Sequence, residues 1–267
     1  MDARSARRRR ALDELVDTVA LEEFERAHGM PCLPAVVVVI AAYKERENIG
    51  SVMEELPETI CDLPAAAIVV IDGEDDGASA IVRKAGQYAV IAPVNRGQGA
   101  ALRLGYRVAR TFGATYIVTA DGDGQADPSD LATILGPVVA GEADFVSGSR
   151  RLGETHNDDP LRNLGVIVFG KIISILMRTH VTDTANPVRA MRAELSGRLT
   201  LDEPQYQASE LLISAVASGA RYAERPVTFR KRSGGTSKKG GNLLYGFRYA
   251  KVLSRTFWRE TKARREK

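Results

Sequence analysis

Two aspartates, Asp121 and Asp123, lie two residues apart in the run YIVTADGDGQ, directly after a β-branched stretch. A glycine follows each of them and allows the backbone to turn. Two carboxylates on a tight loop after a strand can share one divalent cation, and Mg²⁺ and Mn²⁺ favour such oxygen ligands. Because Mg²⁺ usually leaves room for substrate phosphates, the spacing predicts a metal-assisted enzyme that acts on a nucleoside diphosphate compound.

An EF-hand calcium loop also begins with Asp-x-Asp. In that loop the sharp turn requires Gly, where this chain has Ala126, and the closing position requires Glu, where it has Ala132. The calcium-loop interpretation therefore fails. An ordinary acidic turn remains an alternative, so the surrounding elements must decide.

Apolar strands alternate with helical patterns from residue 35 to about residue 150. Such alternation predicts an α/β fold, with a mostly parallel, Rossmann-like central sheet covered by helices on both faces. The expected strands are residues 36–41, 67–71, 89–91, 116–120 and 145–147, and the expected helices are residues 49–56, 77–85, 100–111 and 128–139.

Segments of different character flank this core. Residues 1–34 have helical apolar spacing and end at Pro31 and Pro34, so we expect an N-terminal helical extension. We expect the main domain over residues 35–230. Residues 231–267 are expected to form a basic flexible loop and an amphipathic C-terminal helix.

Composition limits the class of protein. The chain has 267 residues, 44% hydrophobic and 27% charged, which is typical of a soluble globular protein. Its longest apolar runs fall short of the roughly 20 residues of a membrane span, and no apolar leader follows Arg10. Cys32 and Cys61 make no disulfide framework, and we expect both to be buried as small apolar residues. These features indicate a cytoplasmic protein.

Charge is distributed unevenly. Residues 221–267 hold 15 Lys and Arg against 3 Asp and Glu, a net charge of +12, whereas the other 220 residues carry a net charge of −9. Aromatic residues such as Phe247 and Trp258 accompany the cations, which favours peripheral contact with a membrane surface. A catalytically silent nucleotide- or nucleic-acid-binding module is the alternative. The basic segment is its only support, because RNA-binding and helix-turn-helix signatures are missing, so we expect no nucleic-acid partner.

Polar groups gather where the expected strands end, and ligands of open α/β sheets bind beyond those ends. The turn in NRGQGAALRLG opens a helix, and helix N-termini attract anions, so Arg96 and Gly97 are expected to face a substrate. The turn lacks the third glycine of a dinucleotide fingerprint and the Gly-Lys-Ser/Thr of a Walker loop. Arg150 ends a later strand, and Arg162 follows; guanidinium groups suit phosphate oxygens.

Together these pieces resemble family 2 of the inverting glycosyltransferases, which have the GT-A fold. Within it they are most similar to the synthases that transfer mannose or glucose to polyprenyl (dolichyl) phosphate. The resemblance covers residues 36–249. It rests on the order and spacing of VVVVIAAYKERENI, IVVIDGEDDGA, NRGQGAALRLG, VTADGDGQADP, FVSGSR, VTDT, ERPVTFRKR and GGTSK.

The resemblance implies a role for each matching residue. The nucleoside would be held by one group, the Mg²⁺ or Mn²⁺ ion and through it the diphosphate by a second, and the donor or acceptor phosphate by a third. Asp183 would lie near the sugar and Glu210 would support the acceptor side. The nucleoside group is Tyr43, Glu45 and Asp72. The cation group is Asp121, Asp123 and Gln125. The phosphate group is Arg150, Arg232, Ser237 and Lys238. Among them, catalysis is expected of Asp123, Arg150 and Asp183.

Three departures from the family pattern affect specificity. Ala41, Ala42 and Lys44 surround Tyr43 where the family often has Pro and Asn, and Ile71 precedes Asp72 where a second aspartate is common. Both concern the nucleobase. Residues 185–189 read Ala-Asn-Pro-Val-Arg where Ser-Gly-Phe-Arg is usual, which concerns the acceptor or sugar pocket.

The expected reaction transfers a hexose from a UDP- or GDP-sugar to a polyprenyl phosphate. A phosphate acceptor is already ionised near neutral pH and needs no strong base. The alternative is a soluble enzyme of the same family that acts on a hydroxyl of a saccharide or small natural product, with Asp183 as the base. The sequence leaves the sugar, the nucleobase and the oligomeric state open.

Overall fold

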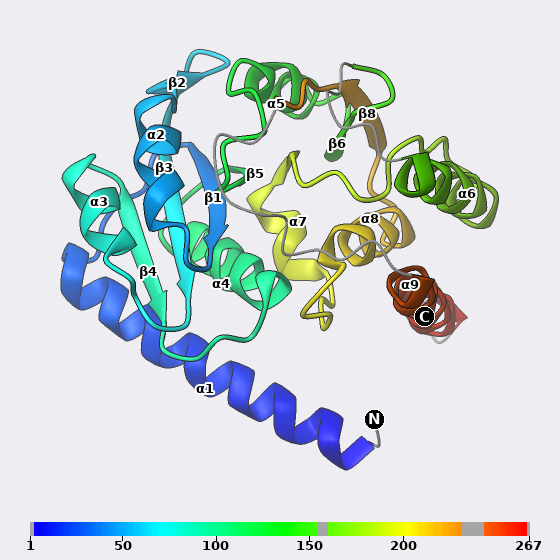
Figure 1. The fold of residues 1–267 in the computed structure, drawn as a ribbon, viewed down its shortest axis with the longest axis horizontal. Helices are drawn as coiled ribbons and strands as arrows, with labels where there is room; N and C mark the ends of the chain where they lie inside the picture. The colour runs from blue at the N-terminus through cyan, green and yellow to red at the C-terminus, as the bar shows by residue number, and fades with distance from the viewer. Residues whose placement is uncertain (1–2, 154–159, 231–242, 266–267) are drawn as a thin grey trace.

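The computed structural model of the protein describes residues 3–153, 160–230 and 243–265. One mixed sheet crosses the molecule, as Figure 1 shows. Its strands are β1 (Val36–Ala42), β2 (Thr59–Ile60), β3 (Leu63–Asp72), β4 (Tyr88–Ala92), β5 (Tyr116–Asp121), β6 (Phe145–Ser149), β7 (Arg189–Arg192) and β8 (Tyr222–Pro226).

Strand direction places several strand ends at one edge. The spatial order is β4-β3-β1-β5-β7-β6-β8, and β2 pairs with the start of β3. β4, β3, β1 and β5 are parallel, β7 is antiparallel to both β5 and β6, and β8 is parallel to β6. β6 therefore runs in the same direction as β5. The carboxyl ends of β1, β3, β4, β5 and β6 share one rim of the sheet, where open α/β sheets bind ligands.

Helices cover both faces, as the sequence predicts. The strands alternate their side chains between two cores, so Val37 and Val39 pack on one face and Val38 and Ile40 on the other. On the first face lie α1 (Ala3–His28), α4 (Gln98–Thr111), α6 (Pro160–Met177), α7 (Ala193–Arg198), α8 (Gln207–Ala217) and α9 (Leu243–Arg265); on the second lie α2 (Arg46–Glu54), α3 (Ala78–Lys84) and α5 (Asp130–Val139).

The N-terminal helix packs directly on the sheet. Figure 1 shows α1 lying along β4 and α4. Phe24 is buried, and its ring centroid lies 5.1 Å from that of Phe112 and 6.1 Å from that of Tyr88. The predicted N-terminal helix is confirmed. It shares a core with the main fold, and the domain boundaries at residues 34 and 230 stay predictions.

Two observations concern the expectations from composition. Cys32 is exposed and Cys61 is half-buried, so the expectation that both are buried is wrong. Cys32 lies between Pro31 and Leu33 in the connection from α1 to β1, and only Leu33 of the three turns into the core. Among the described helices, none is both long and apolar enough to span a bilayer.

Candidate active site at the rim of the sheet

The Asp121–Asp123 loop begins where β5 ends. Asp121 is the last residue of β5, and its Oδ1 accepts a hydrogen bond from Gln98 Nε2 at 3.3 Å. Asp123 Oδ1 accepts a hydrogen bond from the backbone amide of Gln125 at 3.2 Å, which turns the loop on itself. The backbone of Gln125 in turn accepts a bond from the amide of Arg230 at 2.8 Å. The two carboxylates therefore lie on a loop that is held by a side-chain bond at Asp121 and by backbone bonds at Gln125.

Tyr43 and Glu45 follow β1, the neighbouring strand. Glu45 Oε2 accepts a hydrogen bond from Asn48 Nδ2 at 2.8 Å, and its backbone carbonyl begins α2. A Cβ added to Gly122 would lie 3.9 Å from Cγ of Glu45, so Glu45 borders the aspartate loop. Tyr43 is exposed, with the Lys44 ammonium 5.5 Å from its ring centroid. Both predicted nucleoside contacts thus lie at the rim; their binding roles stay predictions.

Asp72 ends β3 and is buried. Its two carboxylate oxygens accept hydrogen bonds from the backbone amides of Arg96 at 3.0 Å and Gly97 at 2.7 Å. Burial raises the pKa of Asp72, and these two amides offset only part of that effect. In this structure Asp72 holds the glycine-rich turn, and its contact with a nucleoside stays a prediction.

The Arg96 side chain points away from the rim. Its guanidinium donates to Asp13 and Asp17 of α1, at 3.3 and 2.7 Å, and is almost fully buried. The expectation that Arg96 binds a nucleotide stays a prediction. No local pattern around Arg96 predicts that its side chain joins the N-terminal helix to the turn.

The loop of residues 203–204 packs against the glycine-rich turn. Gly99 donates its amide to the carbonyl of Pro204 at 2.9 Å, and a Cβ on Gly99 would lie only 2.0 Å from the carbonyl oxygen of Glu203. The backbone of residues 203–204 therefore packs directly on the start of α4. Glycine is required at position 99 because this close approach leaves no room for a side chain.

Arg150 and Asp183 form the most buried ion pair of the rim. Arg150 Nε lies 2.7 Å from Asp183 Oδ2 and Arg150 Nη2 lies 2.9 Å from Oδ1, a two-point contact. The backbone amides of Arg150 and Ala185 also donate to Asp183, at 3.2 and 3.1 Å. The Arg150 guanidinium packs over the Phe229 ring at 5.5 Å from its centroid. Asp183 is thus saturated with donors and 0% exposed.

Electrostatics keep this pair ionised. Burial alone would raise the pKa of Asp183, but the hydrogen bonds and charge of Arg150 outweigh burial and hold that pKa below its ordinary value. Burial disfavours the charged form of Arg150, whereas Asp183, and to a smaller extent Asp121, raise its pKa. Arg150 therefore stays cationic within the field of the aspartate loop.

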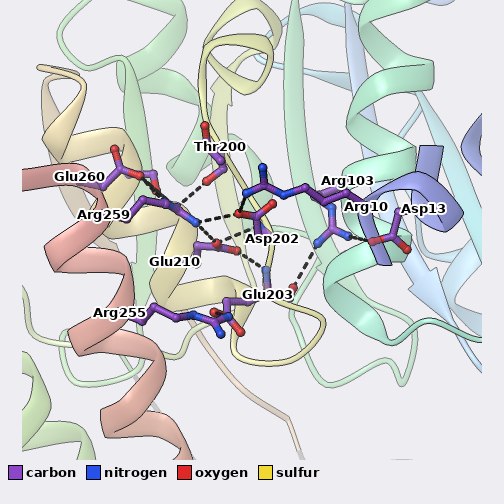
Figure 2. A network of polar contacts seen from close by, with 11 residues as sticks. Arg10, Asp13, Arg103, Thr200, Asp202, Glu203, Glu210, Arg255, Arg259 and Glu260 are labelled. Atoms are coloured by element: carbon purple, nitrogen blue, oxygen red, sulfur yellow. Dashed lines mark hydrogen bonds and ion pairs between the residues drawn. The ribbon is translucent and has the colours of Figure 1, made fainter. Parts of the chain in front are cut away.

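Glu210 lies away from the rim, in the network of Figure 2. It is 0% exposed and accepts hydrogen bonds from the backbone amides of Asp202 and Glu203, at 2.8 and 2.9 Å. Arg259 of α9 completes its shell at 2.8 Å. Glu210 joins α8, α9 and the loop that packs on Gly99. Its expected role on the acceptor side stays a prediction. The partners that Glu210 has in the structure hold parts of the fold together.

The remaining predicted residues have no described side chains. Arg162 belongs to the first turns of α6, and Arg232, Ser237 and Lys238 fall outside the described residues. Arg230, the nearest described residue before the last three, pairs with Glu55 and Asp127 and bonds the backbone of Gln125.

Three residues that the sequence did not single out support the site. Gln98 bonds Asp121, Phe229 packs under Arg150, and Glu224 of β8 holds the backbone of Asp183. Each lies within a motif already quoted, but their partners are distant in the sequence. Of the three, only Gln98 could have been found from the local sequence, because it directly follows the glycine that opens a helix.

The donor set suits a hard divalent cation. Asp121, Asp123 and the Gln125 amide offer oxygen atoms on one short loop, without sulfur or imidazole ligands, and this chemistry fits Mg²⁺ or Mn²⁺. Across the part of the chain that the structure describes, no group of three or more His, Cys, Asp and Glu forms a complete protein cage. Two carboxylates with a substrate diphosphate are therefore the fitting arrangement.

Comparison with known proteins defines the class. The sequence profile of glycosyl transferase family 2 matches residues 37–199, more than half of the chain. The chain therefore belongs to glycosyl transferase family 2 and is a glycosyltransferase.

Several of the similar proteins have names that state an activity. The dolichyl-phosphate hexose transferase of Haloferax volcanii is 32% identical over 201 residues, covering 75% of this chain and 85% of its own. The undecaprenyl-phosphate mannosyltransferase of Micrococcus luteus is 26% identical over 221 residues, covering 78% and 89%.

A solved structure confirms the fold. The glucosyl-3-phosphoglycerate synthase of Mycobacterium tuberculosis, in complex with Mn²⁺, UDP and glucosyl-3-phosphoglycerate, superposes with a TM-score of 0.63 at 18% identity. The match covers 90% of this chain and 83% of that one. At this identity the likeness establishes the α/β fold of the chain and nothing about its substrate.

Proposed function

We propose that the protein transfers a hexose from a nucleoside diphosphate sugar to a polyprenyl phosphate, with inversion at the anomeric carbon. The observation that carries this proposal is the Asp121–Asp123 loop at the end of β5, beside the glycine-rich turn and within the field of Arg150. The curated relatives named for dolichyl or undecaprenyl phosphate support the acceptor class.

Residues of the rim would divide the work on the donor. Asp121, Asp123 and Gln125 would hold Mg²⁺ or Mn²⁺, and the cation would neutralise charge that develops on the departing diphosphate. Arg150, kept cationic by Asp183, would donate hydrogen bonds to phosphate oxygens. Tyr43, Glu45 and Asp72 would contact the nucleoside. Inversion requires the acceptor to approach opposite the leaving group, so both substrates must be held in line.

The environment of Asp183 favours a phosphate acceptor over a hydroxyl acceptor. A hydroxyl needs a base that can take its proton, and Asp183 was the candidate from the sequence. Its carboxylate is fully buried, accepts four hydrogen bonds, and has a pKa below the ordinary value. A group in this state is a poor base. An ionised phosphate attacks without one, so the arrangement supports the lipid phosphate.

Two neighbouring helices support peripheral membrane association. Among the described side chains of α6, its outer face exposes four large apolar ones, Val168, Ile172, Ile175 and Leu176, at helical spacing. The Phe169 ring of α6 packs 4.7 Å from that of Tyr249 in α9, so the helices are adjacent, as in Figure 1. α9 exposes Phe247 and Trp258 together with cationic residues. An apolar face beside aromatic and basic residues is typical of helices that lie in the membrane interface.

A transfer assay tests the proposal. The protein is incubated with UDP- or GDP-hexoses and a polyprenyl phosphate in anionic vesicles, with Mn²⁺ or with chelator, and glycolipid is measured by mass spectrometry. We expect a lipid product that depends on the cation, with the anomeric configuration opposite to that of the donor by NMR. A parallel arm offers 3-phosphoglycerate and simple sugars as hydroxyl acceptors. Transfer to these alone would overturn the lipid-phosphate acceptor, and no transfer from any donor would overturn the whole proposal.

A further inference from the structure

Glu224 of β8 holds the peptide that carries Asp183. Its Oε1 accepts hydrogen bonds from the backbone amides of Thr182 at 2.9 Å and Asp183 at 3.2 Å. Its Oε2 accepts a bond from Thr182 Oγ1 at 2.7 Å. Tyr222, two residues earlier on the strand, donates its hydroxyl to Oε1 at 2.9 Å. One half-buried carboxylate thus receives donors from both the main chain and the side chains around it.

These bonds connect Glu224 to Arg150 by two routes. Through Asp183 they fix the carboxylate that grips the Arg150 guanidinium at two points. Through Thr182 they reach Ser149, whose Oγ lies 2.6 Å from Thr182 Oγ1 and accepts the amide of Arg151 at 3.2 Å. The residues before and after Arg150 are therefore held by the same group as its side chain.

Strand pairing explains why Glu224 can do this. β8 is parallel to β6, and Glu224 is in register with Ser147, three residues before Arg150. The carboxylate thus lies beside the end of β6, and the segment before β7 returns past the same place. A charged acceptor in this position binds amides more strongly than a neutral one would.

We propose that Glu224 is a positioning residue for the sugar transfer: by holding the Thr182–Asp183 peptide, it fixes the direction in which Arg150 presents its guanidinium to the departing diphosphate. The proposal rests on the proposed function, because it assigns the orienting group of that same site. Glu224 would touch no substrate, and its effect would pass entirely through Arg150.

Kinetics of Glu224→Gln test the coupling. Glutamine keeps the size of the side chain and one acceptor oxygen, but its amide nitrogen cannot accept the bonds that Oε2 receives from the Thr182 amide and hydroxyl. It also removes the negative charge that strengthens the remaining bonds to the peptide. We expect kcat to fall about tenfold or more with little change in the donor KM, which is the signature of an interaction made mainly in the transition state. Tyr222→Phe is the matched control, because it removes one bond to Glu224 and leaves both peptide bonds in place. Its kcat should stay within about twofold of the wild type.

A double-mutant cycle separates positioning from general loss of structure. In an Arg150→Ala background, Glu224→Gln should change kcat by less than about twofold, since the group it orients is gone. An equal fall in both backgrounds would overturn the proposal, as would wild-type kcat in Glu224→Gln alone. Thermal unfolding is measured for each variant so that partly unfolded protein is not read as slow enzyme.

A spectroscopic measurement tests whether Glu224 positions Arg150 without relying on an activity assay. The Arg150 Nε proton, bonded to Asp183, should give a slowly exchanging arginine side-chain resonance that disappears in Arg150→Lys. We expect Glu224→Gln to raise its exchange rate with water at least fivefold, and Tyr222→Phe to leave it unchanged. An unchanged rate in Glu224→Gln would refute the proposal even if sugar transfer is confirmed. Absence of transfer in the wild type would refute only the proposed function.

Discussion

The guanidinium of Arg150 grips the carboxylate of Asp183 at two points, with Nε 2.7 Å from Oδ2 and Nη2 2.9 Å from Oδ1. The pair links the end of β6 to the segment before β7, two parts of the chain 33 residues apart. It keeps one cation at the rim of the sheet and removes one carboxylate from the solvent. The first effect concerns the binding of the departing diphosphate, and the second concerns whether Asp183 can act as a base.

Asp183→Asn should lower stability in a pH-dependent way. Removing one partner of a buried ion pair costs about 3–5 kcal/mol, and Asp183 is fully buried. The pKa of Asp183 is depressed in the folded protein, so its contribution is present above the unfolded pKa, about 3.9, and is lost as pH falls through the folded pKa. Urea unfolding of both proteins should show a large gap at neutral pH that narrows in acid. An equal gap at both pH values would contradict the assignment.

Removing the aspartate pair should abolish cation-dependent nucleotide binding. Asp121→Ala with Asp123→Ala takes away both carboxylates of the loop, so we expect UDP or GDP affinity in Mn²⁺ to fall at least a hundredfold, about 2.7 kcal/mol. Chelator should have the same effect on the wild type. Asp144→Asn is the control, because Asp144 precedes β6 at the opposite edge and pairs with Arg221. Calorimetry should find its affinity unchanged. Equal losses in control and variant would point to a general charge effect.

Gly99→Ala should disrupt the donor side of the site. A methyl group there would lie 2.0 Å from the Glu203 carbonyl oxygen, so the loop of residues 203–204 must move and release the start of α4. We expect an overpacking cost of about 1–3 kcal/mol and weaker nucleotide binding. Gly165→Ala, in α6 with nothing within 4 Å of the added Cβ, should be neutral or stabilising, since alanine favours a helix. Thermal unfolding and nucleotide titration of the two variants make the comparison.

Arg259→Ala should loosen α9 from the body of the protein. Glu210 is 0% exposed and would lose its cationic partner, so we expect a loss of about 3 kcal/mol, at the low end of values for broken buried pairs because Arg259 is partly exposed. Trp258, the single tryptophan, lies on α9 and reports the transition by fluorescence. Arg255→Ala removes a more exposed pair with Glu203 and should cost less. The reverse order would show that Glu210 does not depend on Arg259.

Ile175→Glu should weaken binding to lipid vesicles. Ile175 is 77% exposed on the apolar face of α6, and a carboxylate there would oppose both insertion and anionic headgroups. We expect a reduction of at least fivefold in sedimentation with anionic vesicles and loss of any blue shift of Trp258 fluorescence. Leu15→Glu, at a site 62% exposed on α1, is the matched control and should bind like the wild type. Equal effects of the two substitutions would argue against α6 as the lipid-facing element.

Local signals in the sequence were enough for the fold class, for most of the strands and helices up to β6, and for the aspartate loop. The apolar runs of β1, β3 and β5, and the glycines after Asp121 and Asp123, are readable within a few residues of one another. The sequence did not predict β7, because this strand has only four residues, two of them arginines, and is antiparallel in a largely parallel sheet. Its pairing depends on strands more than 40 residues away, and no periodicity within RAMR reports that.

Long-range partners of buried charges could not be predicted. The sequence marks Glu210 and Asp183 as acidic residues near apolar ones, and nothing local says which cation meets each. Glu210 pairs with Arg259, 49 residues later, and Arg96 pairs with Asp17, 79 residues earlier. Such pairs are fixed by the packing of whole helices. The roles of Asp183 and Glu210 were therefore assigned by resemblance, and the structure alone identifies their partners.

Asp202 accepts contacts from Arg10 of α1, 192 positions earlier, and from Arg259 of α9, 57 positions later. During synthesis this loop reaches its final surroundings only after α9 has left the ribosome. Until then Glu210 has no cation, and the backbone that packs on Gly99 lacks its outer support. Contacts of such large sequence separation form late in folding. The glycine-rich turn should therefore be among the last parts of the nascent chain to become rigid, so the enzyme would acquire a competent donor site only when α9 docks.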